Sequence, residues 1–239
     1  MRETEARNDR AFCAVEALLQ RLHPREDAHA LTQSLREQFV SADVLFHAGA
    51  HMLERAGLKP ADALLLSHLP ELSRCMQRAS FDRKPRLDRL DLAARYLAAN
   101  FYGLQVERFY MLCLDARGRL KERVLLQEGT SDSALFSLKA MLAELVRVNP
   151  CAVILSHNHP GRTLRPSRED VDCTLEALRA LTVVGVPLLD HVIIAGERAV
   201  SLRANGFIPA GEWLAQNPQH RLLRLWLEPS GEERSSGTD

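Results

Sequence analysis

The sequence lacks an excess of charge of either sign. It has 239 residues, of which 31 are lysine or arginine and 31 are aspartate or glutamate, so its formal net charge is zero. Proteins that act mainly on nucleic acid usually carry a basic surplus. We therefore expect DNA binding to be weak and limited to local basic patches.

The Cys-x-x-Cys spacing of many metal and redox sites is also missing, although five cysteines are present. Three of them, Cys113, Cys151 and Cys173, lie in apolar segments. Intracellular cysteines in such segments are usually reduced and buried. The cysteines therefore predict a cytosolic protein with reduced, buried thiols.

Long apolar runs are absent as well. None approaches the length of about 18 residues that a membrane-spanning helix needs. The N-terminal stretch Met1-Arg2-Glu3-Thr4-Glu5 is charged where a signal peptide would be apolar. Apolar residues still make up 46% of the chain, which is enough for a packed core. We expect a soluble, cytoplasmic protein that does not associate with a membrane.

The apolar pattern divides the chain into a helical first third and a mixed remainder. Apolar residues recur at helical spacing up to residue 77, and Pro70 is expected to start or kink a turn. A polar, basic stretch over residues 78–86 then marks a boundary. We expect a helical N-terminal domain over 1–84, a second domain over 85–228 and a disordered tail over 229–239.

The second domain alternates between helical and strand patterns. Helices are predicted over 87–100, from a cap at 131–133 to residue 148, over 167–182 and over 212–227. Strands are predicted over 109–114, 120–127, 151–156, 188–195 and 199–202. A strand–helix–strand unit within a sheet flanked by helices indicates an α/β or α+β fold.

Candidate metal ligands gather between the strand at 151–156 and the helix that follows it. His157 and His159 are two residues apart at the strand end, so their side chains point to the same side. Asp170 lies in the first turn of the next helix. Two imidazoles and one carboxylate, with no fourth protein ligand evident, are typical of a catalytic zinc site that leaves one position for water.

The start of that helix has a simpler interpretation. Ser167 followed by Asp170 fits a capping box, in which each side chain accepts a hydrogen bond from the other residue's backbone N–H. The carboxylate also suits the positive end of the helix dipole. We expect a conflict, since Asp170 cannot fully close this box and bind a metal at the same time.

His157, His159, Ser167 and Asp170 together resemble the JAMM (JAB/MPN) zinc metalloprotease domain, whose pattern is His-x-His, seven residues, Ser, two residues and Asp. The resemblance narrows to the RadC branch of that family and covers about residues 87–210. It rests on Ser-His-Asn-His-Pro (156–160), Pro-Ser-Arg-Glu-Asp (166–170), Gly-Val-Pro-Leu-Leu-Asp-His-Val-Ile-Ile (185–194) and Val-Ser-Leu-Arg (200–203). It implies a mixed sheet flanked by helices, of the JAMM and cytidine-deaminase type.

The resemblance also implies roles for single residues. His157, His159 and Asp170 would bind zinc, and Ser167 would donate to the oxyanion of the reaction. The family's upstream glutamate, which acts as the base, matches Glu107 just before an apolar strand. Two other glutamates compete for that role, Glu128 and, less well, Glu122. Asp190 and His191 would either support the ligands from behind or be structural.

The implied activity is zinc-dependent hydrolysis of a peptide or isopeptide bond in an unknown peptide or protein substrate. Two other interpretations stay open, a DNA-associated repair accessory and a non-catalytic interaction protein with the same fold. The neutral charge argues against the first of these. The complete ligand set argues against the second.

Two departures from the branch are visible in the sequence. Its helical region usually carries a helix-hairpin-helix-like Gly-Ile-Gly turn, whereas Gly57-Leu58-Lys59 lacks the second glycine, which disfavours phosphate binding there. Gly161-Arg162-Thr163 stands where Ser-Gly-Asp is usual. Arg162 and Arg165 either steer an acidic substrate terminus or are solvated loop residues.

Overall fold

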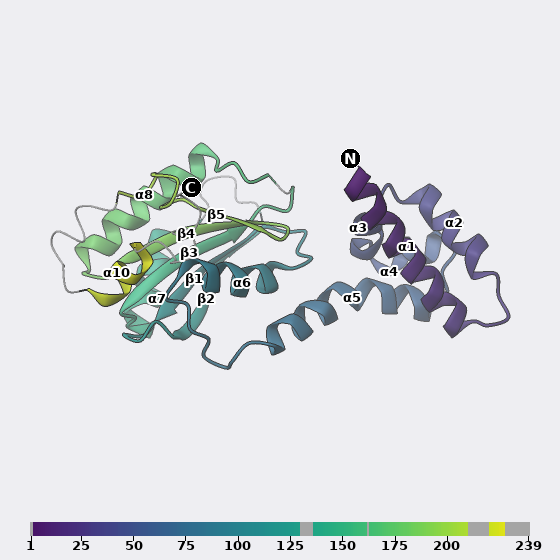
Figure 1. Ribbon diagram of the computed structural model, residues 1–239, viewed down its shortest axis with the longest axis horizontal. Coiled ribbons are helices and arrows are strands. Elements are labelled where there is room, and N and C mark those ends of the chain that lie inside the picture. The colour runs from purple at the N-terminus through teal and green to yellow at the C-terminus, as the bar shows by residue number, and fades with distance from the viewer. Residues whose placement is uncertain (1, 130–135, 162, 210–219, 228–239) are drawn as a thin grey trace, which may run out of the picture. The chain divides into compact units, whose positions relative to one another are not determined.

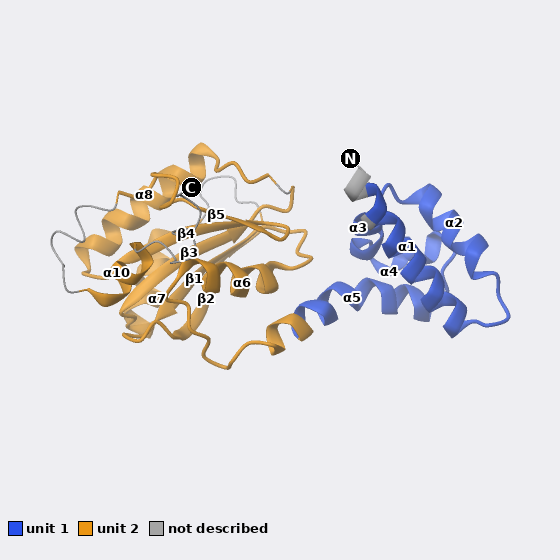
Figure 2. Ribbon diagram, in the orientation of Figure 1, with its two compact units in different colours: residues 1–75 blue, residues 76–239 orange. Residues whose placement is uncertain are grey.

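The computed structural model describes residues 2–129, 136–161, 163–209 and 220–227 (Figure 1). The chain divides into two compact units, residues 1–75 and residues 76–239 (Figure 2). The division falls inside helix α5 (Pro60–Ala79), before the basic stretch at 78–86 where the sequence predicts a boundary.

The first unit is helical. Its elements are α1 (Arg2–Leu22), α2 (Ala28–Gln38), α3 (Ala42–His47), α4 (Ala50–Arg55) and the greater part of α5. Asp27 and Ser41 are the N-caps of α2 and α3, because each side-chain oxygen accepts a backbone N–H of the first turn. Phe12, Leu35 and Leu53 belong to a core that lies wholly within this unit.

Helix α5 continues through Pro70, so the helix start expected there is wrong. Proline removes one backbone hydrogen bond from a helix interior. Ala63 and Leu66, about two turns and one turn earlier, are fully buried in the core of the first unit. Packing on that face supports the helix across the proline, since tertiary contacts override local propensity.

The second unit contains a five-stranded mixed sheet in the order β2-β1-β3-β4-β5. Its strands are β1 (Arg108–Leu114), β2 (Leu120–Glu128), β3 (Ala152–Asn158), β4 (Leu188–Ala195) and β5 (Arg198–Ser201). Its helices are α6 (Leu90–Phe101), α7 (Leu138–Val148), α8 (Arg168–Val183) and α10 (Arg221–Leu227). Only β3 and β4 pair in parallel among the described strands, and α8 makes the crossover between them. The predicted α/β class, with helices flanking a mixed sheet, is confirmed.

Helices cover both faces of the sheet because side chains alternate along each strand. On β1, Tyr110, Leu112 and Leu114 pack with α6 and α10. Phe109, Met111 and Cys113 point the other way and pack with α7 and α8. His157, predicted as a metal ligand, lies on this second face near the carboxyl end of β3.

Several element boundaries differ from the sequence-based expectations. Helix α7 begins at Leu138 with Ser137 as its N-cap, because the Ser137 side chain accepts the Ala140 N–H; the cap expected at 131–133 lies outside the described residues. The sequence predicts a helix over 212–227. The structure describes residues 220–227 of that range, and they contain α10. The tail at 229–239 also lies outside the described residues.

The expectation of buried thiols is wrong for Cys151. This residue precedes β3 and is exposed, as are Cys13 and Cys75, whereas Cys113 is buried within β1. Burial raises the pKa of the Cys113 thiol to about 12, so it stays protonated at neutral pH. None of the described helices has the length and apolar character to cross a membrane.

Candidate metal centre

The centre is built where β3 ends beside β1 and α8. In the antiparallel pairing of β1 with β3, Phe109 lies opposite His157. When the same register is extended by two residues, just beyond the start of β1 and the end of β3, Glu107 comes opposite His159. Asp170 reaches the same place from the first turn of α8, the helix that follows the loop after β3. Residues that are far apart in sequence therefore meet because the sheet register and the crossover bring them together.

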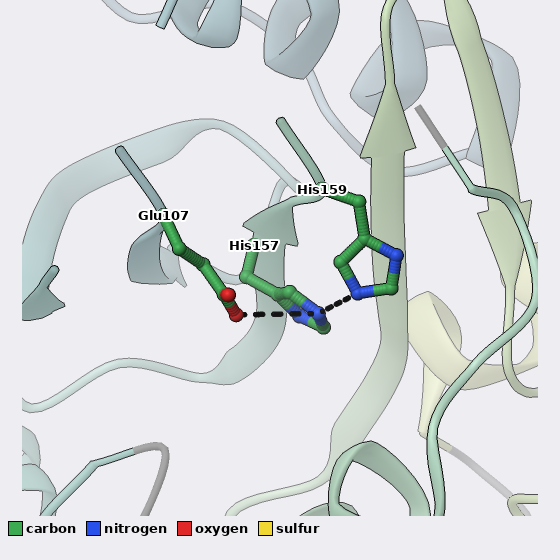
Figure 3. A group of neighbouring side chains, drawn as sticks. All are labelled: Glu107, His157 and His159. Carbon is green, nitrogen blue, oxygen red and sulfur yellow. Dashed lines mark hydrogen bonds and ion pairs between the residues drawn. The ribbon is translucent and has the colours of Figure 1, made fainter. Parts of the chain in front are cut away.

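The side chains of Glu107, His157 and His159 lie close together (Figure 3), and Asp170 contacts both imidazoles. The Nε2 atoms of His157 and His159 are 2.8 Å apart. Asp170 Oδ1 lies 3.0 Å from His157 Nε2, and Asp170 Oδ2 lies 3.4 Å from His159 Nε2. Glu107 Oε1 lies 3.8 Å from His157 Nε2. The structure thus brings together the three residues predicted as ligands and the predicted base.

The site is closed on one side and open on the other. The side chains of His157 and Asp170 are 0% and 2% exposed, whereas those of His159 and Glu107 are 12% and 28% exposed. The solvent-exposed side of the site is therefore the side of Glu107 and His159. Asp170 forms the buried floor of the site.

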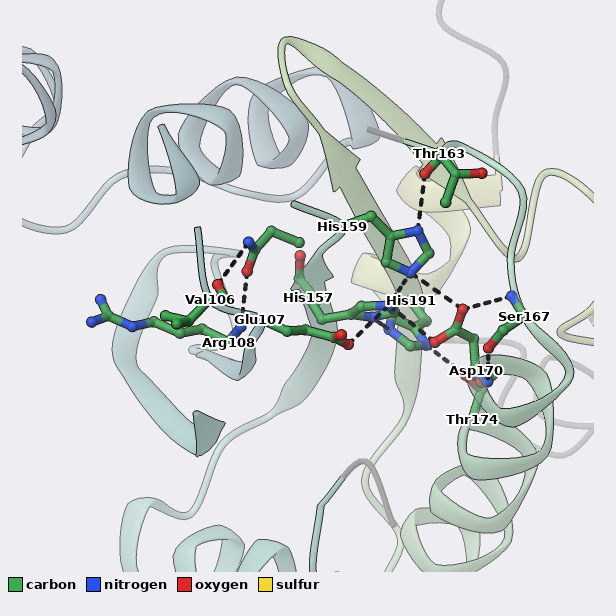
Figure 4. A network of polar contacts seen from close by, with 12 residues as sticks. Val106, Glu107, Arg108, His157, His159, Thr163, Ser167, Asp170, Thr174 and His191 are labelled. Atoms are coloured by element: carbon green, nitrogen blue, oxygen red, sulfur yellow. Dashed lines mark hydrogen bonds and ion pairs between the residues drawn. The ribbon is translucent and has the colours of Figure 1, made fainter. Parts of the chain in front are cut away.

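A chain of hydrogen bonds behind His157 controls which of its nitrogens carries a proton (Figure 4). Thr174 Oγ1 donates to the Asp170 carbonyl at 2.5 Å and also lies 2.5 Å from His191 Nδ1. Because the hydroxyl has one proton, His191 Nδ1–H must be the donor in the second contact. His191 Nε2 then accepts the Nδ1–H of His157 at 2.8 Å, and in the neutral ring His157 Nε2 carries the lone pair.

His159 is oriented in the same way. Its Nδ1 donates to the Thr163 carbonyl at 2.9 Å, so in the neutral ring its Nε2 carries the lone pair. Metal-binding histidines usually have the second nitrogen fixed by such a partner. Two Nε2 lone pairs and a carboxylate that converge from three elements fit a divalent cation.

Protonation of the groups follows from their surroundings. Burial raises the pKa of the Asp170 carboxyl, but His157 and His159, whose Nε2–H groups donate to Asp170 when the rings are protonated, outweigh burial and hold that pKa well below its usual range. The hydrogen bond to Asp170 in turn raises the pKa of His159. Complete burial, reinforced by His157, lowers the pKa of His191 well below its ordinary value, so His191 is neutral. The site therefore holds an ionised carboxylate at neutral pH.

The capping box expected at the start of α8 is present. Asp170 N–H donates to Ser167 Oγ at 3.0 Å, and Ser167 N–H donates to Asp170 Oδ2 at 2.7 Å. Asp170 Oδ1 still faces His157. The cap thus uses Oδ2, which also lies 3.4 Å from His159 Nε2, and leaves Oδ1 facing His157; the conflict expected from the sequence stays a prediction. Ser167 Oγ accepts in the cap and keeps its own proton to donate.

The other residues singled out in the sequence lie elsewhere. Glu128 pairs with Arg108 at 2.9 Å, and Glu122 pairs with Arg147 at 2.5 Å. Arg165 is exposed, and Arg162 lies outside the described residues. Asp190, on the opposite face of the sheet from His191, accepts hydrogen bonds that include Trp226 Nε1–H at 3.1 Å and is structural. Only His191 of the Asp190-His191 pair contacts the site.

Sequence reasoning missed Asn158 and Thr174. Asn158 Oδ1 accepts the Arg108 N–H at 2.9 Å, and its Nδ2 donates to the Val106 carbonyl at 3.0 Å. These two bonds tie both peptide groups that flank Glu107 to the end of β3. Thr174 had a usable signal, because it lies four residues after Asp170 and shares its helix face.

The fold and the site together define an α/β protein of the JAB type with a candidate metal site. A family model for the RadC-like JAB domain matches residues 87–207, and the chain belongs to this family.

The relatives found by sequence similarity include three UPF0758 proteins. One from Bordetella parapertussis is 36% identical over 152 residues, which span 64% of this chain and 68% of that protein. One from Thermosynechococcus vestitus is 34% identical over 147 residues, or 62% of this chain and 59% of that protein. One from Pseudoalteromonas translucida is 31% identical over 179 residues, or 74% of this chain and 80% of that protein. These alignments and the family model support the resemblance seen in the sequence.

Proposed function

We propose that the protein is a zinc-dependent hydrolase of peptide or isopeptide bonds, of the RadC type. The observation that carries this proposal is the convergence of His157 Nε2, His159 Nε2 and the Asp170 carboxylate, with Glu107 at the open rim. The mixture of two imidazoles and a carboxylate suits zinc, and three protein ligands leave a position for water.

Two carboxylates compete for the metal. Ligand atoms of Glu107, His157 and His159 all lie within 4.8 Å of one another. Asp170, however, lies within 3.0 Å and 3.4 Å of the two imidazoles and is buried, whereas Glu107 lies 3.8 Å from one of them and is partly exposed. We assign Asp170 as the third ligand and Glu107 as the base.

The residues around the metal then have distinct tasks. When bound, zinc supplies Lewis-acid chemistry that lowers the pKa of a water molecule toward about 7. Glu107 accepts the proton of the attacking water and delivers it to the leaving amine. Ser167 Oγ–H donates to the oxyanion of the tetrahedral intermediate, and one such donor is worth about 3 kcal/mol. Asn158 holds the backbone on both sides of Glu107, which keeps the base in place.

DNA binding through the first unit has less support. The Gly57 N–H donates to the Glu54 carbonyl at 3.0 Å, and the Leu58 N–H donates to the Leu53 carbonyl at 3.1 Å. These turn amides are therefore already used within the unit. The Lys59 ammonium forms an ion pair with Glu26. We propose that this turn makes at most a weak contribution to DNA binding at about 0.15 M salt, where phosphate contacts are screened.

The role of Glu107 is tested by Glu107→Gln, which keeps the shape of the side chain but removes its basicity. We expect this variant to retain zinc and to lose hydrolysis of a peptide library by at least about 100-fold, the usual contribution of a general base. Cleavage products are measured by mass spectrometry, and zinc by atomic emission.

Glu128→Gln is the matched control, because Glu128 was the competing candidate and lies in an ion pair with Arg108. It should cleave the library at the rate of the unmodified chain. Full activity in Glu107→Gln, or loss of activity in Glu128→Gln alone, would move the base away from Glu107.

A further inference from the structure

A second candidate site lies at the other end of the sheet from the metal centre. It is a pocket of about 230 Å³ lined by Arg86, Arg117, Arg119 and Arg221. Arg117 and Arg119 lie in the turn between β1, which ends at Leu114, and β2. Leu114 is five residues along β1 from Phe109, the partner of His157, so roughly 16 Å of strand separates the two places. The arginine pocket is therefore independent of the metal ligands.

Three segments of the second unit are fixed against one another to form the pocket. The Leu87 N–H donates to the Gly118 carbonyl at 2.7 Å, and the Leu120 N–H donates to the Pro85 carbonyl at 2.9 Å. Gly118 has a φ of +75°, and a Cβ there would lie 2.5 Å from Asp88 Cβ and 3.1 Å from Leu222 Cδ2. The close approach that glycine permits joins the β1–β2 turn to the segment before α6 and to the start of α10.

The arginines are only partly neutralised. Arg86 pairs with Asp88 at 2.6 Å, and Arg119 Nη1 donates to the Lys84 carbonyl at 3.2 Å. Within the described ranges, the guanidinium groups of Arg117 and Arg221 have no hydrogen bond or ion pair.

Asp115, in the turn between β1 and β2, does not neutralise the guanidinium groups of the pocket. Asp115 Oδ1 accepts the backbone N–H groups of Arg117 and Arg119 at 2.8 Å and 2.9 Å, so it stabilises the turn. Cationic groups that converge without counter-charges repel one another, and an anion between them would remove that repulsion.

We propose that the arginine pocket binds a phosphate group. Guanidinium groups bind phosphate oxygens in pairs, and several of them around one small space match a tetrahedral, multiply charged anion. The pocket is smaller than those that enclose drug-sized ligands, which favours a compact group over a large organic molecule. The phosphate is supplied either by a small phosphorylated compound or by the backbone of a nucleic acid, and the same oxygens are recognised in both.

Titration of the full-length protein with pyrophosphate at low ionic strength tests this site. The variant carries Arg117→Gln and Arg221→Gln, which remove the two guanidinium groups without partners and leave the Arg86–Asp88 pair intact. Arg179→Gln, at an exposed position on α8, is the control for loss of positive charge. We expect the Kd for pyrophosphate to rise at least about tenfold in the double variant and to stay unchanged in Arg179→Gln, with circular dichroism unaltered in both.

A second arm uses a short single-stranded oligonucleotide as the competitor. Displacement of pyrophosphate by the oligonucleotide, lost in the double variant, identifies the nucleic-acid backbone as a source of the phosphate. Binding of pyrophosphate without displacement identifies a small phosphorylated ligand. The proposal is overturned if the unmodified protein binds neither probe, or if the double variant binds them as tightly as the unmodified protein. Zinc content is unaffected in every case, so the result is separate from the test of the metal centre.

Discussion

At the residue scale, the central feature of the site is the set of hydrogen bonds that orients its carboxylate and its imidazoles. Asp170 divides its two oxygens between the Ser167 N–H and the imidazole of His157. His191 and Thr174 fix the proton of His157 on Nδ1. A metal would thus meet lone pairs that are already oriented toward it, which reduces the reorganisation that binding requires.

The lowered pKa of Asp170 predicts a pH dependence of stability in the metal-free protein. A carboxyl whose pKa is lower in the folded state contributes stability above its ordinary pKa of 3.8 and loses it as the pH falls toward the folded value. In the presence of a chelator, Asp170→Asn should reduce the free energy of unfolding by roughly 2 kcal/mol at pH 7 and by clearly less at pH 3.

Urea unfolding at the two pH values measures this difference. Asp172→Asn serves as the control, since Asp172 lies two residues further along α8 and its side chain is 63% exposed. Its effect should be small at both pH values. An effect of Asp170→Asn that is as large at pH 3 as at pH 7 would show that the carboxylate is not held in its ionised form by the histidines.

At the element scale, the site depends on the end of one strand and the start of one helix. The sequence predicted both, because the apolar run before His157 and the Ser167–Asp170 spacing are local signals. It predicted the three candidate ligands for the same reason. The contacts of Asn158, Thr174 and His191 were not predictable to the same degree, since they depend on sheet register and on the position of α8 across the sheet.

Substitution of Ser167 separates its two roles at the start of α8. Ser167→Ala removes both the cap and the hydroxyl, and should lower the free energy of unfolding by about 1 kcal/mol. Ser167→Gly keeps the capping conformation and should cost only a few tenths of a kcal/mol, yet it also lacks the hydroxyl. We expect both variants to lose about 100-fold in the rate of hydrolysis, as for removal of one oxyanion donor.

Chemical denaturation and the cleavage assay together measure the two effects. Ser167→Thr retains a capping oxygen and a hydroxyl, and should be close to the unmodified chain in both assays. If Ser167→Gly hydrolysed the substrate at the unmodified rate, Ser167 would be a cap alone.

At the scale of the whole molecule, each unit has its own core. One apolar cluster lies wholly in the first unit, and two others lie wholly in the second, one on each face of the sheet. Every residue proposed for the metal centre also belongs to the second unit. We therefore propose that the second unit is an independent folding unit that contains the complete site.

A chain that begins at residue 80, just after α5, tests this division. We expect it to unfold in one cooperative transition and to bind zinc with the same stoichiometry and affinity as the full chain. Calorimetry measures the unfolding, and competition with a chromogenic chelator measures the affinity. A fragment that is unfolded, or that binds zinc much more weakly, would show that the first unit is needed for the site.

The metal content of the purified chain tests the proposed centre most directly. We expect about one zinc per chain, and loss of that zinc when His157→Ala and Asp170→Ala are combined, because two of three protein ligands are removed. Asp172→Ala, on the same helix but exposed, should retain the metal. A metal content that is the same in the unmodified chain and in the double variant would contradict the proposed centre.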